Sequence, residues 1–361
     1  MKNCKVRLDF DEIKEIGQEG RNSKVFLAHD NQLDGEIVVK EIKKNPSTSP
    51  DEYFKEARLL YAHNHNNIVK VNYACEDDDN IYVAMPFYKN GSLKKRISNG
   101  SYLTVREVIR YSIQFLSGLN HIHSKGLVHF DIKPDNILIS DSNEAMLSDF
   151  GLALYTDTYG FCTAQACYTP HITPEQLKGL NQTIKNDIYQ AGLTIYRMVN
   201  GNELFYRQIP NTGNPMLDDV AFKRMISNGL FPNRKCYLPH IPKKLKKIIK
   251  KCIEPNPNDR YDNTLQIINE LASINENLDI RYGRDTSGEF WEAPKNSYVY
   301  KVSLSQNADN FNIKVCKTKD GKTTNCVSLC SNNIDNTQVI PKLEACLLYT
   351  SPSPRDMRRS R

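Results

Sequence analysis

The segment from His129 to Asn136, which reads HFDIKPDN, concentrates side chains that are suited to chemistry on phosphate groups. A carboxylate such as Asp131 can orient or deprotonate an attacking hydroxyl, and Lys133 can neutralise charge on a phosphoryl group in transfer. Asn136 and Asp149, which follows a strand-like run, can hold a divalent metal against phosphate oxygens. Because phosphoryl transfer requires positioning and charge rather than covalent chemistry from the protein, this set of residues predicts that reaction.

The order of two motifs carries a family resemblance. HFDIKPDN followed by Asp149-Phe150-Gly151 resembles the eukaryotic-like (Hanks-type) protein kinases, and a lysine two residues after the aspartate is typical of the serine/threonine branch. The resemblance implies an α+β fold with a β-rich N-terminal lobe and a mostly helical C-terminal lobe. It also implies transfer of the γ-phosphate of ATP to protein hydroxyls with Mg²⁺ or Mn²⁺, including autophosphorylation. The style of the chain indicates a bacterial member.

The resemblance assigns roles to four catalytic residues. Asp131 is expected to act as the base and Lys133 to stabilise the phosphoryl group. Lys40 closes the apolar run IVVK, where the family places the lysine that pairs with the α- and β-phosphates. Its expected ion-pair partner is Glu56, on a helix predicted to start at Ser49-Pro50-Asp51-Glu52. Asn136 and Asp149 are the expected metal ligands.

A nucleotide pocket is expected in front of these residues. The strand-turn-strand pattern from Leu8 to Lys44 resembles the glycine-rich loop that covers the phosphates, although its glycines are imperfectly spaced. The segment AMPFYKNGSL resembles the hinge between the lobes. The residues that the resemblance assigns to nucleotide binding are Gly17, Gly20, Val25, Val38, Lys40, Met85, Pro86, Tyr88 and Leu138.

Several further positions are expected to hold the catalytic loop in place. Apolar residues at helical spacing predict a helix from Thr104 to His123, with Thr104 and Glu107 forming a capping box. By resemblance, Asp187 tethers the backbone of the catalytic loop, and Glu175 pairs with Arg260. On the preceding helix, Phe54, Ala57, Leu60 and Tyr61 are expected to share one apolar face. Phe130 replaces an arginine that in many relatives binds a phosphate on the activation segment, so that mode of switching is not carried over.

The chain is predicted to contain a kinase domain at 8–272, with lobes at 8–88 and 89–272. After Asn275, alternating segments around SYVYKVSL and NFNIKVCKTK predict a small β-rich or α+β module at 276–345, which is expected to be truncated. TTNCVSLC is a candidate third strand and NTQVIPKLEA a candidate helix. Residues 346–361 begin with CLLYTSPSPRD, which matches the translation of a transposase-type sequencing adapter, and are predicted to be an artefact.

Composition narrows the classes of partner. Of the formal net charge of +6, the adapter-like segment contributes +3, from four arginines against one aspartate, so the remainder gives no argument for nucleic-acid or membrane binding. No run approaches the roughly 18 apolar residues of a membrane span, and the start MKNCKVRLDF does not resemble a signal peptide. We therefore expect a cytoplasmic enzyme with protein substrates, and a further partner or ligand for the C-terminal module.

Two alternative functions compete with an active protein kinase. The imperfect glycine loop and Phe130 are compatible with a pseudokinase that acts as a nucleotide-binding scaffold. A small-molecule phosphotransferase of the antibiotic- or choline-kinase type shares the HxD chemistry. The complete set of proposed catalytic residues argues against the scaffold. Lys133, together with the Pro174-Glu175, Asp187 and Arg260 set, favours protein substrates.

Overall fold

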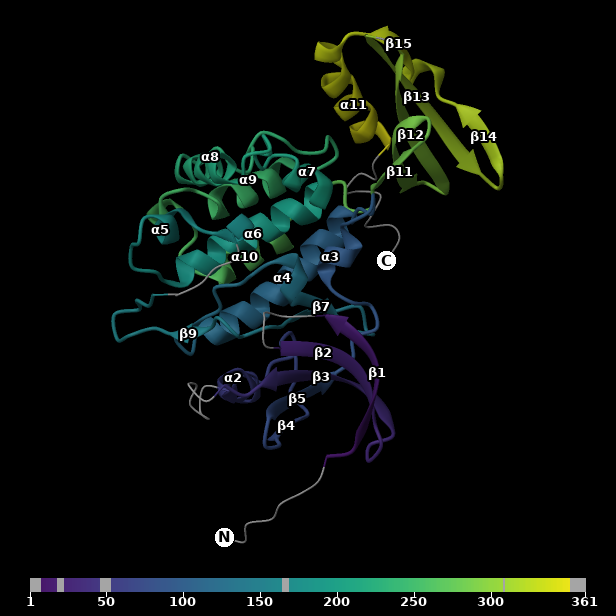
Figure 1. Ribbon diagram of the computed structural model, residues 1–361. Helices are drawn as coiled ribbons and strands as arrows, with labels where there is room; N and C mark the ends of the chain where they lie inside the picture. The colour runs from purple at the N-terminus through teal and green to yellow at the C-terminus, as the bar shows by residue number, and fades with distance from the viewer. Residues whose placement is uncertain (1–7, 18–22, 46–52, 164–168, 308, 351–361) are drawn as a thin grey trace.

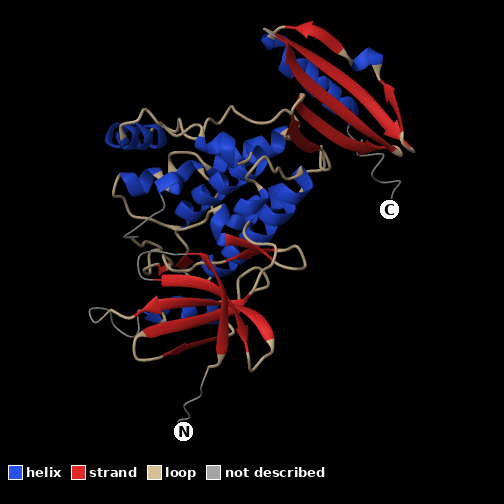
Figure 2. Cartoon of the chain, turned by 45° about the vertical axis from the view of Figure 1, so that its right-hand side comes forward, coloured by secondary structure: helices blue, strands red, loops and turns tan. Residues whose placement is uncertain are grey.

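A computed structural model describes residues 8–17, 23–45, 53–163, 169–307 and 309–350. The chain forms a β-rich N-terminal lobe, a mostly helical C-terminal lobe and a further sheet with one long helix, which lies at the far end of the C-terminal lobe from the N-terminal lobe (Figures 1 and 2). The predicted two-lobed α+β fold with an additional β-rich module is therefore confirmed. Among the described residues, no helix is both long and apolar enough to cross a membrane.

The N-terminal lobe is an antiparallel five-stranded sheet with the order β1-β2-β3-β5-β4. Its strands are β1 (Phe10–Gly17), β2 (Ser23–Asp30), β3 (Gly35–Lys43), β4 (Tyr73–Glu76) and β5 (Asn80–Pro86). Alternating apolar residues bury one face of this sheet around Phe26, Val39 and Ala84. Helix α2 (Lys55–Ala62) lies beside the sheet, where Ala57 packs with Ile81 and Val83.

One prediction for α2 is wrong. Tyr61 was expected on the apolar face, but its side chain is 80% exposed, whereas Leu59 is buried beside Leu60 in the main core. Successive helical residues are about 100° apart around the axis, so a face centred on Leu59 and Leu60 turns Tyr61 toward solvent. The predicted start at Ser49-Pro50-Asp51-Glu52 lies outside the described residues.

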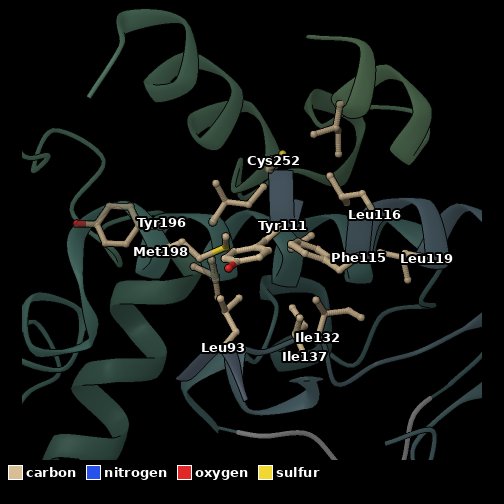
Figure 3. Packing of buried hydrophobic residues seen from close by; sticks show 14 of the residues in the cluster. Leu93, Tyr111, Phe115, Leu116, Leu119, Ile132, Ile137, Tyr196, Met198 and Cys252 are labelled. Carbon is tan, nitrogen blue, oxygen red and sulfur yellow. The ribbon is translucent and has the colours of Figure 1, made fainter. Parts of the chain in front are cut away.

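The C-terminal lobe is built around two long helices, α4 (Val105–His123) and α6 (Ile184–Asn200). Thr104 and Glu107 form the predicted capping box at the start of α4. Side chains from α4 and α6, including Phe115, Leu119, Tyr196 and Met198, meet Leu93 and Ile132 in one continuous core (Figure 3). The catalytic loop is therefore anchored to this core through the buried side chain of Ile132.

Shorter elements complete the lobe. The helices and helical turns are α3 (Leu93–Arg96), η1 (Pro134–Asn136), η2 (Thr169–His171), α5 (Pro174–Leu177), α7 (Asn202–Tyr206), α8 (Pro215–Ser227), α9 (Lys243–Cys252), η3 (Pro257–Asp259) and α10 (Thr264–Ala272). Two small antiparallel pairs flank the catalytic loop and join β6 (Leu127–Val128) to β9 (Leu154–Tyr155) and β7 (Ile137–Ile139) to β8 (Ala145–Leu147).

The C-terminal module is an antiparallel sheet with the order β10-β11-β12-β13-β14, and β15 also pairs with β13. Its elements are β10 (Arg281–Asp285), β11 (Gly288–Lys295), β12 (Tyr298–Asn307), β13 (Asn310–Lys319), β14 (Lys322–Asn325), η4 (Val327–Leu329), β15 (Ser331–Ile334) and α11 (Asn336–Thr350). Helix α11 packs through Val339, Leu343 and Leu347 on the core of the sheet, and thus continues past residue 345.

Aromatic contacts join the module to the C-terminal lobe. The indole Nε1 of Trp291 donates to Nδ1 of His240 at 3.1 Å, and the Tyr282 ring lies between Trp291 and Tyr102, with ring centroids 5.1 and 4.5 Å away. Arg106 on α4 adds a two-point ion pair with Asp279, with N–O distances of 2.6 and 2.8 Å. The module is therefore anchored by a buried aromatic cluster and a charged pair.

Candidate active site

One face of helix α6 holds the catalytic loop in position. The carboxylate of Asp187 is fully buried and accepts hydrogen bonds from the backbone N–H groups of His129 and Phe130, both at 2.8 Å. One turn later, Gln190 accepts from the N–H of Ile132 and donates to the carbonyl of Phe130. Residues three apart share a helix face, so α6 presents both side chains to the loop. The predicted Asp187 tether is present.

The catalytic loop presents Asp131 with its carboxylate partly engaged. Oδ2 of Asp131 accepts from Nζ of Lys133 at 2.7 Å and from Nδ2 of Asn136 at 2.8 Å. Its other oxygen, Oδ1, is buried and has no hydrogen-bond partner among the described residues. Because an unpaired buried carboxylate oxygen is costly, this atom is poised to accept a hydrogen bond from a bound hydroxyl.

The loop is also joined to the Asp149-Phe150-Gly151 segment. Nε2 of His129 contacts the carbonyl of Ser148 at 3.1 Å, and the His129 ring packs edge-on against Phe150. Phe130 and Asp149 both have positive φ values, of 66° and 60°. Non-glycine residues adopt this conformation at a cost of order 1–3 kcal/mol each, and such residues cluster at functional sites.

The N-terminal lobe supplies an ion pair to the same cleft. Nζ of Lys40 on β3 lies 2.9 Å from Oε2 of Glu56 on α2, and the two side chains are only 10% and 15% exposed. The Lys40–Glu56 pair expected from the resemblance is therefore formed. A second expected pair is also present, since Arg260 contacts both carboxylate oxygens of Glu175 at 2.7 and 2.8 Å.

A cavity of about 480 Å³ lies between the lobes and brings most of the predicted site residues together. Its walls include Val25, Val38, Lys40, Glu56, Met85, Pro86, Tyr88, Asn136, Leu138 and Asp149. Ile16, Val69, Phe87, Lys89, Gly91, Ser92, Lys95, Asp135 and Ser148 also line it and were not predicted. Most of these follow or precede predicted residues by one or two positions, which is the signal that could have identified them.

Four predicted residues stand outside this lining set. Gly17 is the last residue of β1 and pairs with Val25, which lines the cavity. Gly20 lies outside the described residues. Asp131 and Lys133 do not line the cavity, but lie next to it through their contacts with Asn136.

A buried network that sequence reasoning missed links the activation segment to the catalytic loop. Nδ1 of His171 lies 2.9 Å from the carbonyl of Ile132 and must carry the proton, since a carbonyl only accepts. Nε2 of His171 therefore accepts from the buried guanidinium of Arg197, also at 2.9 Å. Burial and the neighbouring Arg197 charge hold the pKa of His171 well below its usual value. No local pattern marks the contact of Arg197 with His171, because it joins segments 26 residues apart in the chain.

The chemistry of the cleft fits ATP and a divalent metal. Val25, Val38, Met85 and Leu138 give the cavity apolar walls suited to a planar base, and Lys40 offers a cation for phosphate oxygens. Asn136 uses its Nδ2 on Asp131, which leaves its amide oxygen for a hard cation, and Asp149 adds a carboxylate.

A two-lobed fold with this set of residues in the cleft defines the protein kinase class. The chain matches the protein kinase domain family over residues 10–271, and it belongs to that family. It is 30% identical over 270 residues to a probable serine/threonine-protein kinase of Clostridium acetobutylicum, covering 73% of this chain and 39% of that protein. It is 29% identical to the serine/threonine-protein kinase PrkC of Bacillus subtilis, covering 69% of this chain and 38% of PrkC.

The length covered differs among the relatives. The chain spans about two fifths of the two proteins just named. It is 28% identical over 298 residues to the serine/threonine-protein kinase PknL of Mycobacterium tuberculosis, covering 80% of this chain and 71% of PknL. The likeness to bacterial serine/threonine kinases agrees with the family that the sequence motifs predict.

Proposed function

We propose that this protein is an active serine/threonine kinase that transfers the γ-phosphoryl group of ATP to protein hydroxyls. The observation that carries the proposal is the geometry around Asp131. Its Oδ2 is held by Lys133 and Asn136, while its buried Oδ1 is left to accept a hydrogen bond. The names of the bacterial relatives support the choice of serine and threonine hydroxyls as acceptors.

The proposed mechanism assigns one task to each group. Asp131 orients the acceptor hydroxyl and takes its proton as the oxygen attacks the γ-phosphorus. The bond from the γ-phosphorus to the bridging oxygen breaks, which releases ADP, and the new phosphoester forms on serine or threonine. Lys133 stabilises the charge on the group in transfer, and Lys40, held by Glu56, orients the α- and β-phosphates.

A bound metal ion has defined ligands in this proposal. Asn136 and Asp149 are the residues that would hold Mg²⁺ or Mn²⁺, and the ion supplies neutralisation of charge on the phosphates. The chain itself contributes the orientation of these ligands. Asn136 is fixed by its hydrogen bonds to Asp131, and Oδ1 of Asp149 accepts from the N–H of Gly151 at 3.4 Å.

The experiment that tests the proposal is the intact mass of the full chain after incubation with ATP and magnesium. We expect a gain of one or more phosphoryl groups in the parent protein. For Asp131→Asn we expect a rate about 10²–10⁴-fold lower, because the amide cannot accept the proton. An Asp131→Asn or Lys40→Ala variant as active as the parent would contradict the mechanism. Nucleotide binding without transfer to any protein would favour the scaffold alternative instead.

A further inference from the structure

The mouth of the cleft beside Asp131 is rich in positive charge. Lys94 and Lys95 are exposed on α3, and Lys95 lines the same cavity as Asn136. Asp135 lies next to Asn136 on η1 and lines the same cavity as Lys95, and Nζ of Lys94 is 2.6 Å from its Oδ1. The residues that flank the acceptor serine or threonine of a protein substrate must pass close to these side chains when the acceptor hydroxyl is at Asp131.

The charge of Asp135 is more than balanced. Asp135 contacts a second cation in addition to Lys94. The guanidinium of Arg197 is buried, and its Nη2 lies 3.7 Å from Oδ2 of Asp135. Arg197 cannot lose its charge at any ordinary pH. Three cations, Lys94, Lys95 and Arg197, thus stand against one carboxylate, which leaves an excess of two positive charges beside the acceptor position.

Asp149, the other carboxylate of the cavity besides Glu56 and Asp135, would be taken by the metal ion and so does not offset this excess. Lys133 and Asp131 pair with each other, as do Lys40 and Glu56.

We infer that the enzyme selects serine or threonine hydroxyls flanked by acidic residues. The inference rests on the proposed function, since it concerns the acceptor of the same site. Asn136 contacts Asp131 at 2.8 Å and Asp135 is its neighbour in the chain. An extended chain advances about 3.3 Å per residue, so side chains one to three residues from the acceptor reach this cationic mouth. Aspartate or glutamate there is attracted, and lysine or arginine is repelled.

The first test uses peptides that differ only in charge. Three peptides carry the same central threonine with glutamate, glutamine or lysine at the three positions on either side. With the full chain and saturating ATP, we expect kcat/KM for the glutamate peptide to exceed that of the glutamine peptide about three- to tenfold, with the lysine peptide lowest. The differences in kcat/KM between the peptides should shrink in 0.5 M salt, because the Debye length there is about half that of a physiological buffer and charges are screened more strongly. Equal values, or preference for lysine, would overturn the inference.

A pair of variants assigns the preference to these lysines. Lys94→Glu/Lys95→Glu should lower the ratio of kcat/KM for the glutamate and lysine peptides at least tenfold. Lys94→Gln/Lys95→Gln, which places no carboxylate beside Asp135, should lower it less. Lys243→Glu/Lys247→Glu makes the same charge change at exposed positions on α9 and should leave the ratio unchanged. The KM for ATP is measured in each variant, because Lys95 also lines the nucleotide cavity.

The outcomes separate this inference from the proposed function. A ratio that is unchanged in the Lys94/Lys95 variants overturns the inference, even if ATP binding changes. Autophosphorylation, or phosphorylation of the neutral peptide, without any ranking by charge overturns the inference and leaves the kinase activity standing. Failure of every peptide together with failure of autophosphorylation overturns the proposed function, and the inference with it.

Discussion

At the scale of single residues, the ion pair of Lys40 and Glu56 connects the N-terminal lobe to the proposed chemistry. Both side chains are largely removed from solvent, so the lysine is held in one place rather than sampling many rotamers. Phosphoryl transfer depends on positioning of the nucleotide, and a misplaced cation weakens it even when the fold is intact. Glu56 therefore acts through Lys40, as a positioning residue.

This argument predicts a specific effect of Glu56→Gln. The amide keeps the shape of the side chain but removes the charge that orients Lys40. We expect kcat/KM for ATP to fall about 10²-fold. Asp219→Asn, which removes one charge from the exposed pair with Lys223 on α8, is the matched control and should have no effect. Steady-state kinetics at varied ATP make the comparison, and equal kinetics of the two variants would contradict the positioning role.

Site residues could be predicted from the sequence where they lie close together in one motif, and not where they come from distant segments. Asp131, Lys133 and Asn136 lie within one motif, and the structure brings them within hydrogen-bond distance of one another. Arg197 and His171 could not be found in this way, since their contact joins segments 26 residues apart in the chain. Buried polar networks are a property of the tertiary structure, which no single window of sequence contains.

At the scale of elements, α6 acts as the scaffold of the catalytic loop. Asp187 accepts from two backbone N–H groups and also contacts Nε2 of His123 at 2.8 Å. Asp187→Asn is close in shape, but its amide nitrogen can only donate, so one or more N–H groups lose their acceptor. Hydrogen bonds to charged groups contribute about 1.5–3 kcal/mol each, and we expect the free energy of unfolding to fall by about 2–4 kcal/mol.

Two measurements check this prediction. Urea denaturation gives the change in stability, and kcat at saturating ATP reports whether the loop is displaced. We expect kcat to fall while the KM for ATP changes little, because Asp187 does not line the nucleotide cavity. Unchanged stability in Asp187→Asn would show that the tether contributes little to holding the loop.

Elements with strong local signals were predicted well, including β12, β13 and α11 of the C-terminal module, but the first hairpin of that module was not. The capping box of Thr104 and Glu107 and the apolar spacing that follows it define α4 to within a residue. The β10–β11 hairpin was missed, because Gly283, Gly288 and Pro294 interrupt the alternation expected of strands. In the structure the Phe290 ring lies against Gly283, and a Cβ there would come within 2.5 Å of that ring. The hairpin is therefore formed by the pairing of β10 with β11 and of β11 with β12, although the alternation in its own sequence is weak.

At the scale of the whole molecule, the module and the kinase lobes share a buried contact through Trp291 and His240. The indole can donate to Nδ1 of His240 only while that nitrogen carries no proton. Burial, together with the nearby Lys246, lowers the pKa of His240 to about 3. The docked arrangement thus requires a neutral imidazole at this contact, in the same way that the network of Arg197 requires a neutral His171.

These two histidines predict how stability depends on pH. Both are buried and stay neutral in the folded protein, whereas in the unfolded chain each binds a proton near pH 6.5. The unfolded state therefore holds more protons below pH 6.5, so stability is full above that pH and is lost as the pH falls toward the folded pKa values. Between pH 7 and 5.5 we expect a loss of about 1.3 kcal/mol for each histidine, or about 2.6 kcal/mol together.

Urea denaturation at pH 7 and pH 5.5 measures this loss, with the fluorescence of Trp291, the single tryptophan of the chain, as the probe. His240→Gln is the informative variant, because the amide oxygen can still accept from the indole but does not titrate. It should remove about 1.3 kcal/mol of the loss between pH 7 and 5.5, which is the share assigned to His240. If the parent were equally stable at both pH values, the folded protein would have to bind these protons, and the neutral hydrogen bonds assigned to His171 and His240 would be wrong.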